Sequence, residues 1–314
     1  MKVILPKRII DMTPIEAAFE GEKNPKVISN LQKALGSIGE ADNKTVKLIN
    51  CGGQGLIFKF ISQRYSCQLL IKIPFYSRFS SEQIAEHAIL KEARILEAIT
   101  LSGLDISPRL ISFDEAGLYL IREYAPGEEL TIVLERSTEA ERNQLLTKEY
   151  DFVRKLFPAF HDNDYEPYTI RDFKPKNIIC ASDKRLYIID FGSCRPEAQM
   201  VSANHNKVKN HIGNGKYLHW PIEQLFEEES VLDRRVDYFA WGVMAYYTLF
   251  LERPYANDTC DLDKAKEEYG KRYLAACERI KDAYQKGRIS AELKDNIIGA
   301  LNPNPRMRFF KTGV

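Results

Sequence analysis

The most informative part of the chain is RDFKPKN at residues 171–177, followed by DFG at residues 190–192. Asp190 stands 13 positions after Asn177, and a third motif, WPIE, follows at residues 220–223. Turns favour Asp, Lys, Pro and Asn for structural reasons alone, so each motif is weak by itself. Their order and spacing together form a much stronger signal than any one of them.

From residue 45 onward, the first half of the sequence has a pattern typical of strands around a glycine-rich turn. Four segments are rich in β-branched and aromatic residues and predict strands: residues 46–50, 56–61, 67–75 and 118–124. Residues 81–100 space their apolar side chains with a period of about 3.6 and predict a helix. The stretch NCGGQGLI at residues 50–57 joins the first two strands, and APG at residues 125–127 indicates a turn.

Beyond residue 128 the pattern is mostly helical, interrupted by strand-like pieces at residues 177–180 and 186–189. A small β-rich part followed by a larger helical part predicts an α+β architecture with two lobes. The expected boundaries are an N-terminal extension at 1–44, a small lobe at 45–124 and a large lobe at 125–314. The extension has no clear motif, although residues 25–35 have helical spacing.

Composition excludes several classes of protein. The 45 basic and 44 acidic residues nearly cancel, so nothing indicates a nucleic-acid partner. The 6 cysteines are scattered without a CxxC pair, which argues against a zinc or dithiol site. The longest uncharged run, residues 238–251, is too short to span a bilayer, which needs about 20 residues. We therefore expect a cytoplasmic protein without membrane insertion, and the sequence leaves its oligomeric state open.

The three motifs resemble the catalytic half of the protein-kinase superfamily, whose signatures run RD-x-K-P-x-x-N, DFG and an APE-like segment. The resemblance covers roughly residues 45–309. It implies a bilobal protein-kinase-like fold and a phosphotransferase that moves the γ-phosphoryl group of ATP onto a hydroxyl. A protein serine or threonine is the leading acceptor. The resemblance also implies ATP and Mg²⁺, with Mn²⁺ as a substitute, and a protein substrate as partner.

The chemistry explains the residue types in the second half. Phosphoryl transfer asks a protein mainly to position the reactants and to neutralise charge. The resemblance implies that Asp172 accepts the proton of the acceptor hydroxyl and that Lys174 places a positive charge on the γ-phosphoryl group. It assigns Asn177 and Asp190 as oxygen ligands for Mg²⁺, the hard cation that bridges the phosphates.

The glycine-rich stretch matches the phosphate-binding loop of the same family. Glycines let the backbone approach a phosphate closely and expose N–H donors. The resemblance assigns Asn50, Gly52, Gly53 and Gly55 to this loop, with Asn50 in the place of its first glycine. Ile57 is expected to cover the adenine ring.

Lys72 ends an apolar strand behind the glycines and resembles the lysine that binds the α- and β-phosphates. Its expected partner is a glutamate on the following helix. Glu92 is the favoured choice. Glu86, somewhat under two helical turns earlier, is the competitor, and it is disfavoured because it would face another direction. The remaining expected nucleotide contacts lie at the hinge between the lobes and are Glu123, Tyr124 and Ala125.

Two structural pairings are expected from the same resemblance. Glu223 of the WPIE motif is expected to pair with Arg308 near the end of the chain. Asp237, at the start of the long uncharged segment, is expected to accept N–H bonds from the catalytic loop. A helix N-cap is the alternative reading of Asp237, and both roles are compatible.

The sequence departs from the family at four places. Ile170 stands where the family has histidine, and Ile222 replaces the usual proline of the APE-like segment. Arg122, just before the hinge, is a cation where apolar residues are common, and it is expected to alter the back of the adenine pocket. Lys216 or Asn214, depending on alignment, stands where many serine/threonine kinases have threonine.

Residues 193–219 correspond to the activation loop. Phosphorylation of Ser193 or Ser202, read by Arg171, is one hypothesis for its regulation, and an unregulated loop is the other.

Two further functions stay open at this stage. A small-molecule kinase of the same fold commonly keeps the catalytic carboxylates but loses the Glu223–Arg308 pairing. A non-catalytic pseudokinase usually loses the strand lysine, the loop aspartate or the DFG aspartate, all of which are present here.

Overall fold

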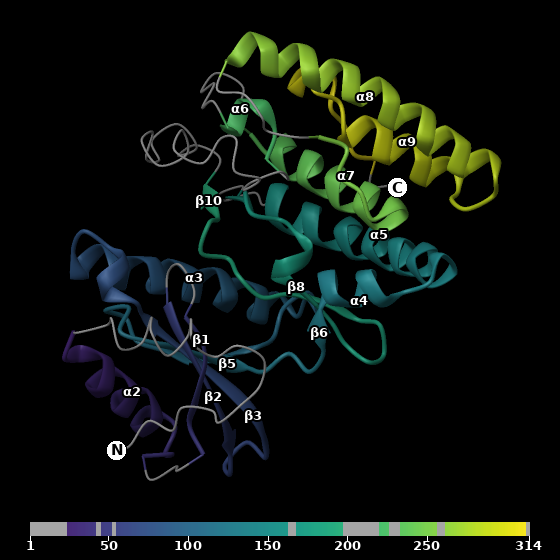
Figure 1. Cartoon of the computed structure of the whole chain (residues 1–314). Helices are drawn as coiled ribbons and strands as arrows, with labels where there is room; N and C mark the ends of the chain where they lie inside the picture. Colours follow the sequence, from purple (N-terminus) through teal and green to yellow (C-terminus); the bar gives the residue numbers. More distant parts are fainter. Residues whose placement is uncertain are drawn as a thin grey trace. The chain divides into compact units, whose positions relative to one another are not determined.

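The computed structural model describes residues 24–41, 45–51, 55–162, 168–196, 220–225, 233–255 and 261–311. The chain divides into two compact units (Figure 1). The small unit comprises Met1–Pro126 with Ile189–Gly192, and the large unit comprises Gly127–Ile188 with Ser193–Val314. The predicted α+β architecture with two lobes is confirmed, because one unit is built on a sheet and the other is mainly helical.

The small unit contains a five-stranded antiparallel sheet in the order β1-β2-β3-β5-β4. Its strands are β1 (Lys47–Cys51), β2 (Gly55–Ser62), β3 (Cys67–Pro74), β4 (Leu110–Phe113) and β5 (Leu120–Glu123). Its helices are α2 (Lys26–Ser37), η1 (Tyr76–Arg78) and α3 (Glu82–Ser102). Each of the four predicted strand segments is therefore present, and β4 is an additional strand.

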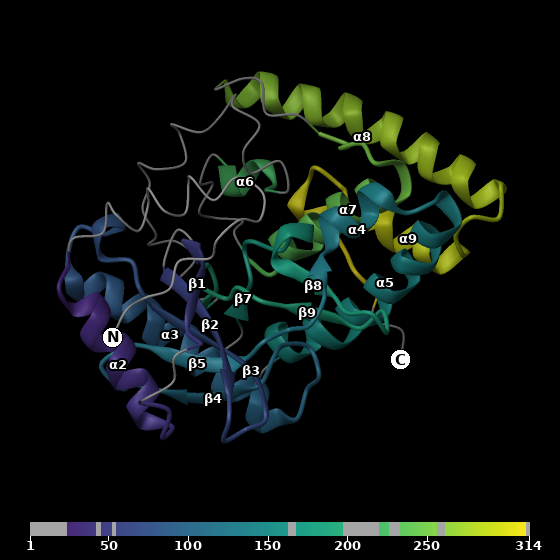
Figure 2. The same cartoon turned by 60° about the horizontal axis from the view of Figure 1, so that its bottom comes forward.

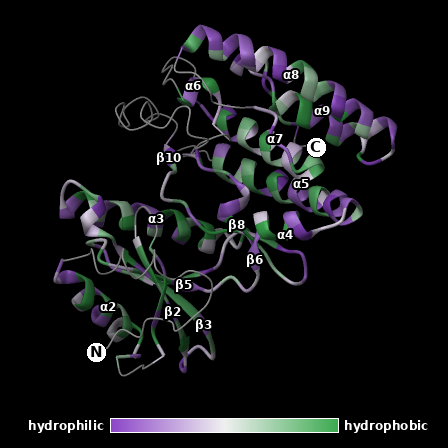
Figure 3. Ribbon diagram, viewed as in Figure 1, coloured by the Kyte–Doolittle hydropathy of each residue, from purple (hydrophilic) through white to green (hydrophobic). Residues whose placement is uncertain are grey.

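The two faces of this sheet have different chemistry. In β3, Ile71 lies on the face covered by α2, where Leu31 and Leu35 are fully buried. Neighbouring side chains of a strand point to opposite faces, so Lys72 lies on the other face, beside α3. Lys72 is paired with Ile57 of β2, which therefore shares its face. Figures 1 and 2 show α2 and α3 beside this sheet, and in Figure 3 β2 and β3 are mainly green.

Helix α2 is tied to the small unit by polar contacts as well as by its apolar stripe. Asn30 donates a hydrogen bond to the Tyr76 hydroxyl at 2.8 Å, and the Lys26 ammonium is 2.7 Å from Glu82 of α3. The helical spacing read at residues 25–35 is confirmed by the observed helix. Apolar burial of Leu31 and its neighbours is the main reason that this segment folds onto the sheet.

Helix α3 has well-defined ends, which fix the residues that it turns toward the sheet. The Ser81 side chain accepts a hydrogen bond from the Ile84 amide, and Gly103 ends the helix in the left-handed region at φ +69°. Glu92 lies on the buried side of this helix. The predicted helix at residues 81–100 is confirmed.

The large unit is built around helices α5, α7 and α9, which pack against one another. Its helices are α4 (Leu130–Arg136), α5 (Glu139–His161), η2 (Pro175–Asn177), α6 (Ile222–Leu225), α7 (Arg235–Phe250), α8 (Leu262–Gln285), α9 (Ala291–Ala300) and η6 (Pro305–Met307). The uncharged run predicted to be a buried helix forms most of α7, whose Trp241 is fully buried. Phe310 packs edge-on against Trp241 at a centroid distance of 5.0 Å.

Short strands hold the loops of the large unit. They are β6 (Glu128–Glu129), β7 (Tyr168–Thr169), β8 (Ile178–Cys180), β9 (Leu186–Ile188) and β10 (Arg195–Pro196). β8 pairs with β6 and β9, and β7 pairs with β10. The segment that carries the RDFKPKN motif therefore lies between two anchored strands, β7 and β8. No helix within the described ranges is long and apolar enough to cross a bilayer.

Candidate active site

The small unit contains the ion pair that the sequence predicts. The Lys72 ammonium of β3 is 2.6 Å from the Glu92 carboxylate of α3, and the side chains are only 6% and 1% exposed. Glu86, the competing candidate, contacts Lys26 of α2 at 3.1 Å instead. The choice of Glu92 over Glu86 as the partner of Lys72 is therefore confirmed by geometry.

Asp190 lies beside this pair. Its Oδ1 is 3.5 Å from the Lys72 ammonium and accepts a hydrogen bond of 3.0 Å from the Gly192 amide. Burial alone would lower the pKa of Lys72, but the negative charges of Asp190 and Glu92 outweigh it and raise that pKa. Lys72 is therefore a fixed positive charge, while the Asp190 side chain is 45% exposed and accessible to a ligand.

Arg122 is a second buried cation near these carboxylates. It is 4% exposed, and its Nη2 donates to the carbonyl of Ile189 at 3.3 Å. Burial lowers its pKa below the usual value, and the charges of Glu92 and Asp190 oppose that shift. In the part of the chain that the structure describes, Arg122 Nη1 and Glu92 Oε1 have no hydrogen-bond partner.

The glycine-rich stretch is described only at its two ends. Asn50 of β1 is paired with Ile57 of β2, while Gly52 and Gly53 lie outside the described residues. At Gly55, a Cβ atom would come within 2.8 Å of the Lys72 side chain and 2.9 Å of a backbone oxygen. Glycine at this position therefore lets β2 lie directly against the base of Lys72.

The hinge residues follow the end of β5, an inner strand of the same sheet. The amide of Glu123 donates to the carbonyl of Arg109 at 2.9 Å, and the amide of Tyr124 donates to Gln68 at 3.0 Å. The Lys59 ammonium lies 3.8 Å from the centre of the Tyr124 ring, and Ala125 is buried. The Glu123 and Tyr124 amides are thus already used within the small unit.

In the large unit, the RDFKPKN loop gathers three predicted residues. The Lys174 ammonium lies 2.8 Å from both carboxylate oxygens of Asp172. The Asn177 side-chain amide donates to the Asp172 carbonyl at 2.9 Å and to its Oδ2 at 3.0 Å. The Asp172 carboxylate is therefore held between the ammonium of Lys174 and the side-chain amide of Asn177.

Asp237 of α7 anchors this loop, as predicted. Its two carboxylate oxygens accept hydrogen bonds of 2.8 Å from the amides of Ile170 and Arg171. Gln224 donates to the carbonyl of Arg171 at 3.1 Å. Arg171 has φ +67°, an uncommon conformation for a residue with a side chain, and these contacts hold it there.

His161 is a contributor that the sequence reading missed. Its Nε2 is 2.9 Å from Asp237 Oδ2, and its ring stacks on Phe157 at 5.0 Å. Ile170, which replaces the family histidine, is buried. An imidazole thus supports the loop anchor from the end of α5. In the sequence, the position of His161 at the end of a long helical segment was the one feature that could have drawn attention to it.

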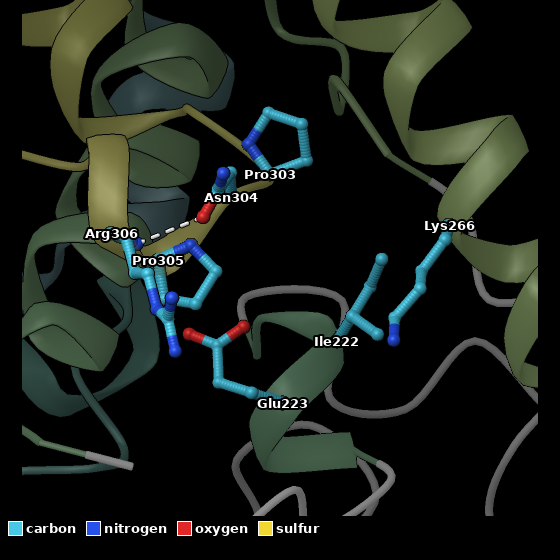
Figure 4. A pocket seen from close by; sticks show the side chains of 7 residues that line it. All are labelled: Ile222, Glu223, Lys266, Pro303, Asn304, Pro305 and Arg306. Atoms are coloured by element: carbon cyan, nitrogen blue, oxygen red, sulfur yellow. Dashed lines mark hydrogen bonds between the residues drawn. The ribbon is translucent and has the colours of Figure 1, made fainter. Parts of the chain in front are cut away.

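The predicted pairing of Glu223 with Arg308 is also present. The Arg308 Nη1 and Glu223 Oε1 atoms are 2.5 Å apart, and both side chains are almost completely buried. Glu223 also lines an open pocket of about 400 Å³ with Ile222, Lys266 and residues 303–306 (Figure 4). Among the described residues, none of the predicted catalytic or nucleotide-binding ones lines this pocket.

Several predictions fall on residues outside the described ranges. These are the activation-loop positions Ser202, Asn214 and Lys216. Phosphorylation of that loop therefore stays a prediction.

A buried lysine–glutamate pair beside a DFG aspartate, together with an anchored loop bearing aspartate, lysine and asparagine, is the arrangement expected of a phosphotransferase. A family model described as "Protein kinase domain" matches residues 44–312. The chain therefore belongs to the protein kinase family.

Known proteins agree with this assignment at modest identity. The chain is 28% identical over 250 residues to Aurora kinase A-B of Xenopus laevis, which covers 78% of this chain and 54% of that protein. It is 29% identical over 157 residues to tyrosine-protein kinase MasK of Myxococcus xanthus, covering 47% and 23%. It is 22% identical over 228 residues to a probable serine/threonine-protein kinase of Clostridium acetobutylicum, covering 72% and 32%. The chain thus spans about half the length of the Aurora relative and a smaller share of the other two proteins.

Proposed function

We propose that this chain is an active protein kinase that transfers the γ-phosphoryl group of ATP to a serine or threonine hydroxyl of a protein. The observation that carries the proposal is the Lys72–Glu92 pair beside Asp190. A buried ion pair is weak evidence for stability, because apolar residues of similar volume often stabilise a fold as well or better. Its presence next to a half-exposed carboxylate is better explained by a ligand that carries phosphate charge.

The small unit supplies the nucleotide contacts in this proposal. Lys72, oriented by Glu92, binds the α- and β-phosphates, and the glycine-rich stretch offers backbone N–H donors to them. Ile57 shares the face of Lys72 and covers the adenine ring. The hinge at Glu123, Tyr124 and Ala125 borders the base.

The large unit supplies the residues that handle the acceptor. Asp172 orients the acceptor hydroxyl and takes its proton, and Lys174 holds the Asp172 carboxylate in place through both of its oxygens. Lys174 then balances the charge of the transferred phosphoryl group. The Asp237 anchor holds this loop in place through two backbone amides.

The residues present fit a divalent cation. Both N–H bonds of the Asn177 amide are directed at Asp172, which leaves the amide oxygen as the ligand atom. Asp190 presents a partly exposed carboxylate. Carboxylate and amide oxygens are ligands that Mg²⁺ or Mn²⁺ accepts, and bound metal supplies neutralisation of phosphate charge. We assign Asn177 and Asp190 as the metal ligands.

The Glu223–Arg308 pair supports a protein acceptor over a small molecule, because small-molecule kinases of this fold commonly lack it. Lys174 supports serine or threonine, as the resemblance implies. The names of the relatives include tyrosine and serine/threonine kinases, so the acceptor residue needs a direct test. We place the reaction in the cytoplasm, because a reducing, ATP-containing compartment suits a kinase whose described cysteines form no disulfide.

The test is incubation of purified chain with radiolabelled ATP, MgCl₂ and a generic basic protein. Asp190→Ala and Asp172→Asn are the inactive comparisons, and Asp183→Asn, an exposed carboxylate of the large unit, is the matched control. Label on the chain or on the added protein is expected for the wild type and for Asp183→Asn only. Phosphoamino-acid analysis then distinguishes serine and threonine from tyrosine.

Two results would contradict the proposal in different ways. ATP binding without label on any protein would favour a small-molecule acceptor. Neither label nor ATP binding would favour a pseudokinase that works through binding alone.

A further inference from the structure

Three cations of the small unit contact one short segment, Ile189–Gly192. Arg122 donates to the Ile189 carbonyl at 3.3 Å, and the Lys72 ammonium is 3.5 Å from Asp190. Lys91, the residue before Glu92 in α3, donates to the carbonyl of Gly192 at 2.7 Å. This segment belongs to the small unit although both of its chain neighbours belong to the large unit. The hydrogen bonds of Arg122 and Lys91 hold it at both ends.

Arg122 is unexpected at its place in the sheet. Its backbone pairs with Leu70 of β3, so its side chain leaves the sheet on the face that also carries Lys72. Removing a guanidinium from water is unfavourable, and an apolar side chain of similar volume would serve packing at least as well. Stability therefore gives no reason for arginine at this position.

The charges near Arg122 suggest what it does. Two cations, Arg122 and Lys72, face two carboxylates, Glu92 and Asp190, so the cluster is balanced. Arg122 Nη1 and Glu92 Oε1 are each without a hydrogen-bond partner among the described residues, and the two groups attract one another. When Lys72 is engaged by phosphate, Arg122 keeps a positive charge beside Glu92.

We propose that Arg122 is a positioning residue that holds the Ile189 carbonyl so that the Asp190 carboxylate is presented to a nucleotide-bound divalent cation, with Lys91 fixing the other end of the segment. The proposal rests on the proposed kinase function. Arg122 acts through the backbone of Ile189 and is not itself a catalytic residue. A lone hydrogen bond to a charged donor is worth enough to change an affinity by about tenfold or more.

The test compares thermal unfolding of the full chain and of Arg122→Met with ATP plus MgCl₂ and with ATP plus EDTA. Ligand binding to the folded state raises the melting temperature according to its affinity. For Arg122→Met we expect the magnesium-dependent part of this rise to correspond to at least about tenfold weaker binding. The rise with ATP and EDTA, and the melting temperature without ligand, should be unchanged or higher.

Companion variants separate positioning from packing. Arg122→Lys, which keeps the charge, should recover part of the magnesium-dependent rise. Lys91→Met should lose part of it and, being only partly buried, keeps the test valid if Arg122→Met does not fold. Arg94→Met, which removes an exposed cation of the same helix, should behave as the wild type.

An unchanged magnesium-dependent rise in both Arg122→Met and Lys91→Met would overturn the proposal. A lower melting temperature without ligand, combined with a normal magnesium response, would also overturn it and show a purely structural role. A wild-type chain without any response to ATP would contradict the proposed function, and the inference with it. A wild-type response that the variants retain contradicts the inference alone.

Discussion

Among the described residues, two buried pairs of a basic side chain with a glutamate, Lys72–Glu92 and Arg308–Glu223, differ in how completely their hydrogen-bonding groups are used. In the large unit, Arg308 binds Glu223 at 2.5 Å and also donates to three backbone carbonyls, those of Asn302, Arg235 and Pro303. In the small unit, Lys72 binds Glu92 at 2.6 Å, but Glu92 Oε1 has no partner among the described residues. The two pairs have similar N–O distances and are similarly buried, but within the described ranges only the Glu223–Arg308 pair has a partner for each carboxylate oxygen.

Under the proposed function, this difference separates a structural pair from one that binds a ligand. Groups that must only hold a fold are stable when every donor and acceptor is satisfied, because each unsatisfied buried group carries a penalty. Groups that must bind a ligand need spare capacity before the ligand arrives. The Glu223–Arg308 pair has the first property, and the Lys72–Glu92 cluster with Asp190 has the second.

The largest effect on folding is expected from Arg308→Met. This change leaves Glu223 buried without a cation, and breaking a buried pair from one side costs about 3 to 5 kcal/mol of unfolding free energy. Urea denaturation measures it. Arg272→Met, which opens an exposed pair with Glu268, is the control and should leave the transition almost unmoved. Equal stability of Arg308→Met and the wild type would remove the distinction between the two pairs.

Lys72→Met should lower the rate of phosphoryl transfer strongly and the stability of the fold less. We expect phosphoryl transfer to fall by roughly a hundred- to a thousand-fold, because a positive charge aimed at the phosphates is lost. Stability should fall less than in Arg308→Met, since Arg122 still supplies a cation near Glu92. Parallel transfer assays and urea curves measure both quantities. A stability loss as large as that of Arg308→Met would mean that Arg122 does not support Glu92.

A third buried carboxylate, Glu149 of α5, extends the comparison to a different partner. Its Oε1 accepts a hydrogen bond of 2.7 Å from Thr248, while its Oε2 has none from the residues described. Burial raises the pKa of Glu149 to about 8, opposed only by the Thr248 hydrogen bond. The folded state therefore holds a proton that the unfolded chain, titrating near its ordinary value, has released.

The sign of the pH effect follows from these two pKa values. The stabilising contribution of protonated Glu149 is complete below the unfolded pKa and is lost as pH rises toward the folded pKa. We expect about 2 to 3 kcal/mol of unfolding free energy to be lost between about pH 6 and about pH 9. Glu149→Gln, which cannot ionise, should lack this part of the pH dependence in urea titrations. Identical pH profiles for the two proteins would show that Glu149 is not protonated in the folded state.

The smallest effect is expected from Ser81→Ala at the start of α3. Loss of the hydrogen bond that Ser81 accepts from Ile84 should cost about 1 kcal/mol of stability. Transfer should stay close to the wild-type rate, because Glu92 lies three turns into the helix and is held by Lys72. Urea curves and initial rates give the two values. A large drop in rate at normal stability would show that the helix start controls the ion pair.

Local signals in the sequence were sufficient for much of the fold and, once the family resemblance implied a glutamate partner for Lys72, for the choice of Glu92. The 3.6 period at residues 81–100 predicts α3, and the direction of side chains along that helix favours Glu92 over Glu86. The Glu223–Arg308 and Asp237 contacts join residues 85 and 66 positions apart, and their prediction rests on the resemblance to the protein-kinase family. The helix prediction succeeds because it depends on a pattern within one element, whereas the long-range pairings were predictable only because the family resemblance implies them.

Other contacts depend on tertiary placement and were beyond the sequence. Nothing local indicates that His161 joins Asp237, or that Arg122 reaches the carbonyl of Ile189, because both contacts join residues more than 60 positions apart. The apolar spacing of α2 predicts a helix but does not say which surface it covers. The sequence alone indicates that Lys91 is a solvated lysine, and only the structure shows its hydrogen bond to the carbonyl of Gly192.

The alternation of Ile71 and Lys72 along β3 has a consequence for genetic screens of this kinase. A shift of the strand by one residue would exchange the two side chains between the faces of the sheet. The apolar packing of Ile71 against α2 therefore fixes the position of the Lys72 ammonium on the opposite face of the sheet. Screens for inactive alleles should recover substitutions at Leu31 and Leu35, which pack in the core on the Ile71 side of the sheet, alongside those at Lys72 itself.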